Sequence, residues 1–158
     1  MRIGQGYDAH RFAPGRALIL GGVTIDYPFG LEAHSDGDVL IHSLCDALLG
    51  AAGLRDIGFH FPDNSEEYKD ISSRHLLTRV VARLDTEGWV LGNADITVVA
   101  QAPKLSPHIE AMRSNLSVDL HSSADKINIK ATTTEGMGFA GRGEGIACYA
   151  VVLIRREA

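Results

Sequence analysis

The strongest constraint on the fold is an apolar run near the end of the chain, from Ile146 to Ile154. Side chains of a strand alternate between its two faces. The faces would carry Ile146, Cys148, Ala150, Val152 and Ile154 on one side, and Ala147, Tyr149, Val151 and Leu153 on the other. Neither face is polar, although a sheet covered by helices on one side should turn polar residues to water on the other. We therefore expect another subunit to cover the second face.

The alternative for this strand is a central position between two helix layers. It is disfavoured because the sequence supplies only three substantial helices. These helices are expected at 38–50, from Ser72 or Ser73 to Gly88, and from Ser106-Pro107 onward. Strands are expected at 1–12, 89–101, 126–131 and 145–155. A hairpin is expected at 17–27, folded at Gly21-Gly22. Their order predicts an α+β fold: a single domain over 1–158, with a mixed sheet and helices packed on one face.

Composition narrows the class of protein. The chain has 158 residues, the length of one domain, and its 15 Lys+Arg against 20 Asp+Glu give a net charge of −5. An acidic balance argues against binding to nucleic acid or to an anionic membrane. Two cysteines cannot form a disulfide framework, and no segment is long and apolar enough for a signal peptide or a membrane span. We expect a cytoplasmic protein.

A candidate metal site joins the first strand to the first helix. Asp8 and His10 share one face of the strand because side chains alternate, and His42 lies on one helical stripe with Asp38 and Asp46. A carboxylate one turn away would fix the tautomer of a ligating histidine. Two histidines and an aspartate leave one position open, the pattern of catalytic zinc. The alternative is a solvated strand end, the more frequent setting of an isolated D-x-H pair.

Three other segments carry groups suited to phosphate. Residues 34–38 (HSDGD) precede the first helix, whose free amides bind phosphate, although Ser35 or Asp36 would serve equally as a cap. Residues 56–58 and 61–65 form a loop with carboxylates, which as turn formers need no function. Residues 130–135 (KATTTE) leave a strand and enter a glycine-rich stretch, a plausible phosphate and Mg²⁺ site or a plain turn. No set of residues indicates a protein nucleophile.

Taken together and in order, these segments resemble the 2-C-methyl-D-erythritol 2,4-cyclodiphosphate synthase family. The matching stretches are 6–10 (GYDAH), 33–38, His42 with Asp46, 56–58, 61–63, 100–104 (AQAPK), 130–135, and 138–145. They span nearly the whole chain. Each is weakly specific alone, and the set is highly specific.

The resemblance implies a homotrimer whose sheets face the threefold axis, with active sites between subunits. It also implies a phosphorus–oxygen lyase of non-mevalonate isoprenoid synthesis. Its substrate would be the cytidine diphosphate 4-diphosphocytidyl-2-C-methyl-D-erythritol 2-phosphate. The 2-phosphate attacks the β-phosphorus, expels CMP and closes a cyclic diphosphate.

The resemblance also implies roles for individual residues. Asp8, His10 and His42 would bind one Zn²⁺ per site, Glu135 would bind Mg²⁺ or Mn²⁺ on the substrate diphosphate, and His34 and Thr133 would stabilise the transition state. Substrate contacts are expected at Asp8, Ala9, His10, His34, Ser35, Asp56, Ile57, Gly58, Phe61, Pro62, Asp63, Asn64, Ser65, Ala100, Gln101, Ala102, Pro103, Lys104, Leu105, Ser106, Thr132, Thr133, Thr134, Glu135, Phe139 and Arg142.

The chain departs from the family pattern at a few positions. Gln5 stands where many members carry His, Ala9 replaces a common Val, and Gly136-Met137 differs from the usual residues beside Glu135. None of these removes an expected ligand.

Two rival functions remain open: a zinc-dependent phosphohydrolase that would release an acyclic product, and a trimeric metabolite-binding protein that would release no CMP.

Overall fold

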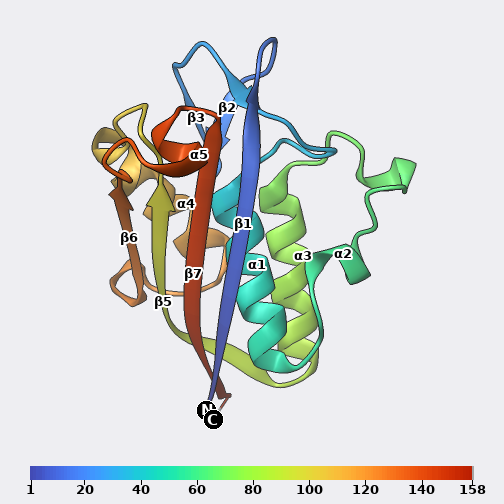
Figure 1. Ribbon diagram of the computed structural model, residues 1–158. Helices are drawn as coiled ribbons and strands as arrows, with labels where there is room; N and C mark the ends of the chain where they lie inside the picture. The colour runs from blue at the N-terminus through green and yellow to red at the C-terminus, as the bar shows by residue number, and fades with distance from the viewer. Residues whose placement is uncertain (158) are drawn as a thin grey trace.

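A five-stranded sheet forms the centre of the molecule (Figure 1). The computed structural model describes residues 1–157. The strands run in the order β4 (Gly30–Leu31), β1 (Arg2–Ala13), β7 (Gly145–Arg156), β5 (Trp89–Val99) and β6 (Ile127–Thr132). β5 and β6 are parallel and the other neighbours are antiparallel, so the sheet is mixed. The expected α+β fold with a mixed sheet is confirmed.

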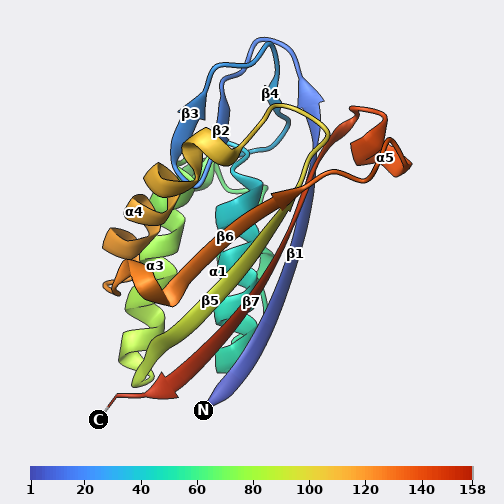
Figure 2. The same ribbon diagram turned by 90° about the vertical axis from the view of Figure 1, so that its left-hand side faces the viewer.

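Three helices pack on one face of the sheet: α1 (Val39–Ala52), α3 (Ser73–Thr86) and α4 (Ile109–Asp119). Figure 2 views the sheet close to its edge, with the three helices on one side of the strands. α1 packs on β1 and β7, α4 packs on β6, and α3 contacts both helices. A separate hairpin of β2 (Leu18–Leu20) and β3 (Val23–Ile25) lies near the start of α1. No helix of residues 1–157 is long and apolar enough to cross a membrane.

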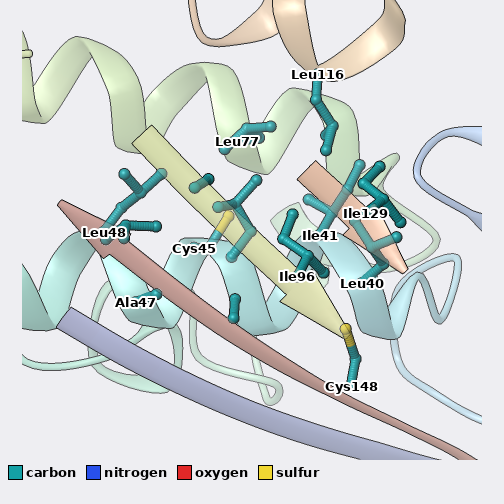
Figure 3. Close-up of a cluster of buried hydrophobic side chains, with 14 of the residues drawn as sticks. Leu40, Ile41, Cys45, Ala47, Leu48, Leu77, Ile96, Leu116, Ile129 and Cys148 are labelled. Carbon is teal, nitrogen blue, oxygen red and sulfur yellow. The ribbon is translucent and has the colours of Figure 1, made fainter. Parts of the chain in front are cut away.

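Helix α1 is buried on nearly all sides because it lies between the sheet and α3. Leu40, Ile41, Cys45 and Leu48 point into the core that Figure 3 shows, together with Ile96 of β5. A helix that is apolar all round is the type found in protein interiors. This burial fixes α1 against the sheet, and so fixes the place of His42.

Two glycines of β1 allow α1 to touch the sheet. A Cβ added at Gly4 would lie 2.0 Å from the carbonyl oxygen of Ala47, and one at Gly6 would lie 1.9 Å from that of Ser43. Neither approach is sterically possible with a side chain in place. The backbones of β1 and α1 are therefore in direct contact, two residues before Asp8.

Asp38 fixes where α1 begins. Its carboxylate accepts hydrogen bonds from the backbone nitrogens of Ile41 at 3.1 Å, Gly21 at 3.0 Å and Gly22 at 2.7 Å. The first bond caps the helix and the other two attach the β2–β3 turn to it. The pKa of Asp38 is raised to about 6, mainly because the carboxyl group is completely buried and also because Asp36 is charged. The three backbone donors favour the ionised form and lower this pKa, but they do not outweigh burial.

Several boundaries differ from the sequence prediction. The strand predicted over 89–101 ends at Val99, and the third helix opens with the 3₁₀ turn η2 (Ser106–His108) before α4. β4 and the one-turn helices α2 (Ile57–His60) and α5 (Gly138–Gly141) were not predicted from the sequence. The same is true of two more 3₁₀ turns, η1 (Glu66–Tyr68) and η3 (Ala124–Lys126). Segments this short carry no detectable periodicity.

The outer face of the sheet exposes several large apolar side chains along β1 and β7. Tyr149 and Val151 are 48% and 46% exposed, and Tyr7 packs on Tyr149 with ring centroids 4.9 Å apart. The opposite face of β7 is buried under α1, as predicted. The alternative of a second helix layer over β7 is therefore wrong, because these side chains remain open to solvent in a single chain.

We predict that Gly6→Ala lowers the free energy of unfolding by about 1–3 kcal/mol, since the methyl group forces α1 away from β1. Urea unfolding followed by circular dichroism measures this. Gly50→Ala is the matched control: Gly50 is an exposed residue of α1 whose Cβ would meet only the Gln5 oxygen, at 4.0 Å. That change should stabilise the protein by up to about 1 kcal/mol. Equal stability of the two variants would contradict the close contact.

Candidate metal centre and active site

Asp8 and His10 of β1 meet His42 of α1 on the inner face of the sheet. His10 Nε2 lies 2.8 Å from Asp8 Oδ2, His42 Nδ1 lies 3.0 Å from the same oxygen, and the two ring nitrogens are 3.2 Å apart. The backbone nitrogen of Ala9 donates to the other oxygen, Asp8 Oδ1, at 3.0 Å. Oδ2 is thereby left to the two imidazoles. The structure brings together the three residues predicted as metal ligands.

The spacing of these three atoms fits one small cation. Zinc bonds to nitrogen and oxygen are 2.0–2.1 Å long, so tetrahedral ligand atoms lie about 3.3 Å from one another. The observed separations of 2.8 to 3.2 Å need only a small expansion to reach that value. The set of two imidazoles and one carboxylate leaves a fourth position for a substrate oxygen or water.

The electrostatics of the cluster favour the ionised form of Asp8. Burial opposes the ionisation of Asp8, but the hydrogen bonds from His10 and His42 outweigh it and hold the pKa of Asp8 well below its usual range. Burial likewise opposes a charge on His42, while the hydrogen bond and the charge of Asp8 prevail and raise the pKa of His42. Asp8 is thus prepared to bind a positive charge.

The far side of the His42 ring contacts two serines. Nε2 lies 3.1 Å from Ser35 Oγ and 2.9 Å from Ser73 Oγ. The expectation that Asp38 or Asp46 would orient this ring is wrong: Asp38 caps α1, and Asp46 accepts from the backbone nitrogen of Ile57 at 2.8 Å. Helical spacing put both carboxylates near His42, but each binds backbone donors instead.

A cavity of about 220 Å³ opens over the metal cluster. Of the predicted site residues it is lined by Asp8, His10, His34, Ser35, His42, Ile57, Gly58, Phe61 and Asp63. His34 Nε2 lies 3.2 Å from the carbonyl oxygen of Ser65, which holds the ring at the edge of the cavity. Ala33, Tyr68, Ile71 and Leu76 also line it and were not predicted. Leu76 lies within the helix expected from Ser72 or Ser73 to Gly88, and Ala33 lies in the family-matching stretch 33–38 without an assigned role. Tyr68 and Ile71 carried no sequence signal.

A second group of predicted residues lines another cavity, of about 350 Å³, at the β6 edge of the sheet. It contains Ala100, Gln101, Pro103, Lys104, Leu105, Ser106, Thr132 and Thr133. Glu135 follows β6, and its backbone nitrogen and carboxylate face Thr133 Oγ1 at 3.3 and 3.5 Å. Gln101 Oε1 accepts from the backbone nitrogen of Gly136 at 3.3 Å, so the two loops are joined.

One chain does not bring the two groups together. β1 and β6 are separated by β7 and β5, and three strand spacings amount to about 14 Å. The predicted residues that line neither cavity are Ala9, Asp56, Pro62, Asn64, Ser65, Ala102, Thr134, Glu135, Phe139 and Arg142. Among these, Asp56 caps α2, and Arg142 pairs with Glu144 at 2.8 Å.

We predict that His42→Ala abolishes stoichiometric Zn²⁺ binding, because two remaining ligands cannot hold the ion against water. Competition with a chromophoric chelator measures the affinity. His60→Ala is the control, since the His60 ring bonds only the Leu54 carbonyl oxygen, at 2.7 Å, outside the cluster. Zinc bound equally by wild type and His42→Ala would refute the site.

Comparison with known proteins agrees with this geometry. The model of the YgbB family matches residues 1–155. The chain is 60% identical over 154 residues to the 2-C-methyl-D-erythritol 2,4-cyclodiphosphate synthase of Azotobacter vinelandii, covering 98% of each chain. It is 61% identical over 156 residues to that of Methylococcus capsulatus, covering 99% of each.

Solved structures show the same fold. The bifunctional IspDF of Campylobacter jejuni matches with a TM-score of 0.95 and 47% identity, over 99% of this chain and 42% of that longer one. IspF of Plasmodium falciparum in complex with CDP matches with a TM-score of 0.88 and 36% identity, over 99% of this chain and 97% of that one. The chain therefore belongs to the YgbB family, the cyclodiphosphate synthases of the non-mevalonate pathway.

Proposed function

We propose that Asp8, His10 and His42 form the catalytic metal site at which this chain performs its family's reaction. In that reaction an oxygen of the substrate 2-phosphate attacks the β-phosphorus of the diphosphate. The bond from the β-phosphorus to the bridging oxygen breaks, and CMP leaves with that oxygen. The observation that carries the proposal is the triangle of ligand atoms, none more than 3.2 Å from another, at the wall of a cavity.

The residues around the cluster suit the folded substrate. A bound Zn²⁺ would act as a Lewis acid on a phosphoryl oxygen. The His34 ring and the Ser35 hydroxyl face the same cavity and can donate to the attacking phosphate. Asp63 can accept from the methylerythritol hydroxyls, beside Gly58. Because both reacting groups belong to one molecule, holding it in an in-line pose supplies much of the acceleration.

The cavity at the β6 edge is proposed to bind the cytidine end. Its walls come from residues 100–106 and 131–133, whose backbone groups can recognise a base without charged side chains. The complex of the Plasmodium falciparum relative with CDP supports a cytidine nucleotide as ligand. Glu135, exposed beside Thr133, would bind the Mg²⁺ or Mn²⁺ that neutralises the diphosphate.

We propose a homotrimer with each active site between two subunits. One observation is the separation of about 14 Å between the strands that carry the two half-sites, which a neighbouring copy could close. The other observation is the group of exposed apolar side chains on β1 and β7, which is of the kind that marks an interface.

The cytoplasm is the proposed location, supported by two buried free thiols, Cys45 and Cys148.

Glu135→Gln tests the second metal. We expect the rate of CMP release to fall by at least about tenfold, with a higher Mg²⁺ concentration needed for half-maximal rate, because the amide binds the cation weakly. Glu110→Gln, a change on the exposed surface of α4, should leave both values unchanged. An unaltered Mg²⁺ titration would show that Glu135 does not bind the metal.

Mass analysis of the product distinguishes the cyclase from a phosphohydrolase, because the acyclic product of a phosphohydrolase carries an added water.

Val151→Glu tests the subunit interface. A buried charge on the β7 face should dissociate the assembly, and sedimentation velocity should show monomers without activity. Val118→Glu is the matched control, because Val118 is an exposed valine of α4, on the helical side of the molecule, and 66% exposed. If Val151→Glu sediments as wild type does, that face is not the interface.

A further inference from the structure

We propose that Asp36 and Ser73 are positioning residues that keep the proton of His42 on Nε2, so that Nδ1 offers its lone pair to the metal. The inference rests on the metal site proposed above. Sequence patterns explain both residues only as helix starts, Asp36 for α1 and Ser73 for α3. In the structure neither residue caps its helix, since Asp38 caps α1 and Ser72 occupies the cap position of α3.

The geometry places Ser73 between a carboxylate and an imidazole. Its Oγ hydrogen-bonds Asp36 Oδ1 on one side and lies 2.9 Å from His42 Nε2 on the other. Ser73 is fully buried, at 0% exposure, so water does not compete for its hydroxyl. Asp36 is itself held by two backbone donors: Asp38 N to Oδ1 at 3.1 Å and Ser73 N to Oδ2 at 3.0 Å.

Counting protons gives the direction of each bond. An aspartate carboxylate only accepts, and both oxygens of Asp36 already accept backbone N–H groups. The single hydroxyl proton of Ser73 must therefore point to Asp36. Ser73 Oγ can then only accept from His42, so Nε2 carries the proton. Ser35 Oγ, 3.1 Å from the same nitrogen, is a second acceptor and also receives Gly37 N at 3.3 Å.

This direction decides what His42 presents to Asp8 and His10. With no cation bound, Nδ1 donates to Asp8 Oδ2 at 3.0 Å. Because Nε2 keeps a proton of its own, a cation displaces the Nδ1 proton and receives the Nδ1 lone pair. Without the Nε2 proton, the only ring proton would lie on Nδ1, where the cation must bind. Partners of this kind typically contribute tenfold to hundredfold in metal affinity. The carboxylate acts through a serine, which explains why the helical spacing of Asp38 and Asp46 did not reveal it.

The test compares Zn²⁺ affinity by chelator competition in Ser73→Ala, Asp36→Asn and the control Ser72→Ala. We expect the first two to bind about tenfold to hundredfold more weakly than wild type. Asp36→Asn keeps the Ser73 hydroxyl but supplies an amide that can donate to it, freeing the serine proton for Nε2. Ser72→Ala should bind as wild type does, because the Ser72 side chain makes no capping hydrogen bond. Ser73→Thr, which keeps the hydroxyl, should restore most of the affinity.

A second readout needs no metal. Nitrogen-15 spectra of the metal-free protein, recorded for wild type and variant at the same pH, report whether Nε2 of His42 is protonated. We expect a proton on Nε2 in wild type and its loss in Asp36→Asn, with Nδ1–H bonded to Asp8 in both, a change that a purely structural role would not cause. This measurement uses only Asp36→Asn and the wild type, so it remains valid even if Ser73→Ala does not fold.

The outcomes separate the two proposals. If wild type binds zinc and both variants bind it equally well, or if Nε2 of wild-type His42 carries no proton, the positioning role is wrong and the metal site stands. If wild type binds no zinc while its spectrum shows Nε2–H, the metal site fails, and with it the purpose assigned to Asp36 and Ser73.

Discussion

Helix α1 lies directly on strand β1 because Gly4 and Gly6 remove the side chains that would hold the two backbones apart. That contact sets the distance between His42 and the two residues that follow the glycines, Asp8 and His10. A longer separation would leave an imidazole and a carboxylate too far apart to share one cation. Apolar burial around Leu40, Cys45 and Leu48 then holds α1 in place. The candidate metal centre thus depends on helix–strand packing more than on any loop.

The segment between β4 and α1 organises the polar side of this contact. Asp38 joins the cap of α1 to the β2–β3 turn, and Asp36 joins the same segment to the start of α3. Arg16 donates to the carbonyl oxygens of Ala33 and Ser35 and so holds the strand end that precedes them. Three elements distant in the sequence therefore meet around the Nε2 side of His42. Buried polar groups of this kind are costly unless satisfied, and no buried side-chain nitrogen or oxygen among residues 1–157 lacks a partner.

The rest of the site lies across the sheet. Residues 100–106 and 132–135 are at the β6 edge, on a loop cluster of their own, and the outer face of β1 and β7 is apolar. On that face the β5 and β6 strands are polar, with Lys130 Nζ 2.6 Å from Asp95 Oδ1. A proposed trimer explains both features, because copies packed on the apolar strands would bring the β6 edge of one chain to the β1 edge of the next.

The amino-acid sequence was sufficient to predict the mixed α+β character, the long strands and helices, and the three residues of the metal cluster. Periodicity identifies a long element such as α3 because burial of one face imposes it over many residues. Alternation in β1 was enough to place Asp8 and His10 on one face, and the first helix supplied His42. The family resemblance added the nucleotide segment and the roles of individual residues. One-turn helices such as α2 and α5, and the cavity residues Tyr68 and Ile71, left no such pattern.

The pairing of each polar group with its partner depends on the tertiary structure. The sequence placed Asp38 and Asp46 on the helical stripe of His42 and indicated Asp36 only as a helix cap. The fold assigns Asp36 to Ser73, Asp38 to the cap of α1 and Asp46 to the backbone of Ile57. Hydrogen bonds act over about 3 Å and are directional, so they depend on where packing places each donor. Hydrophobic patterning acts along the chain and is visible in it, whereas this selection among carboxylates depends on residues 8 to 73 meeting in space.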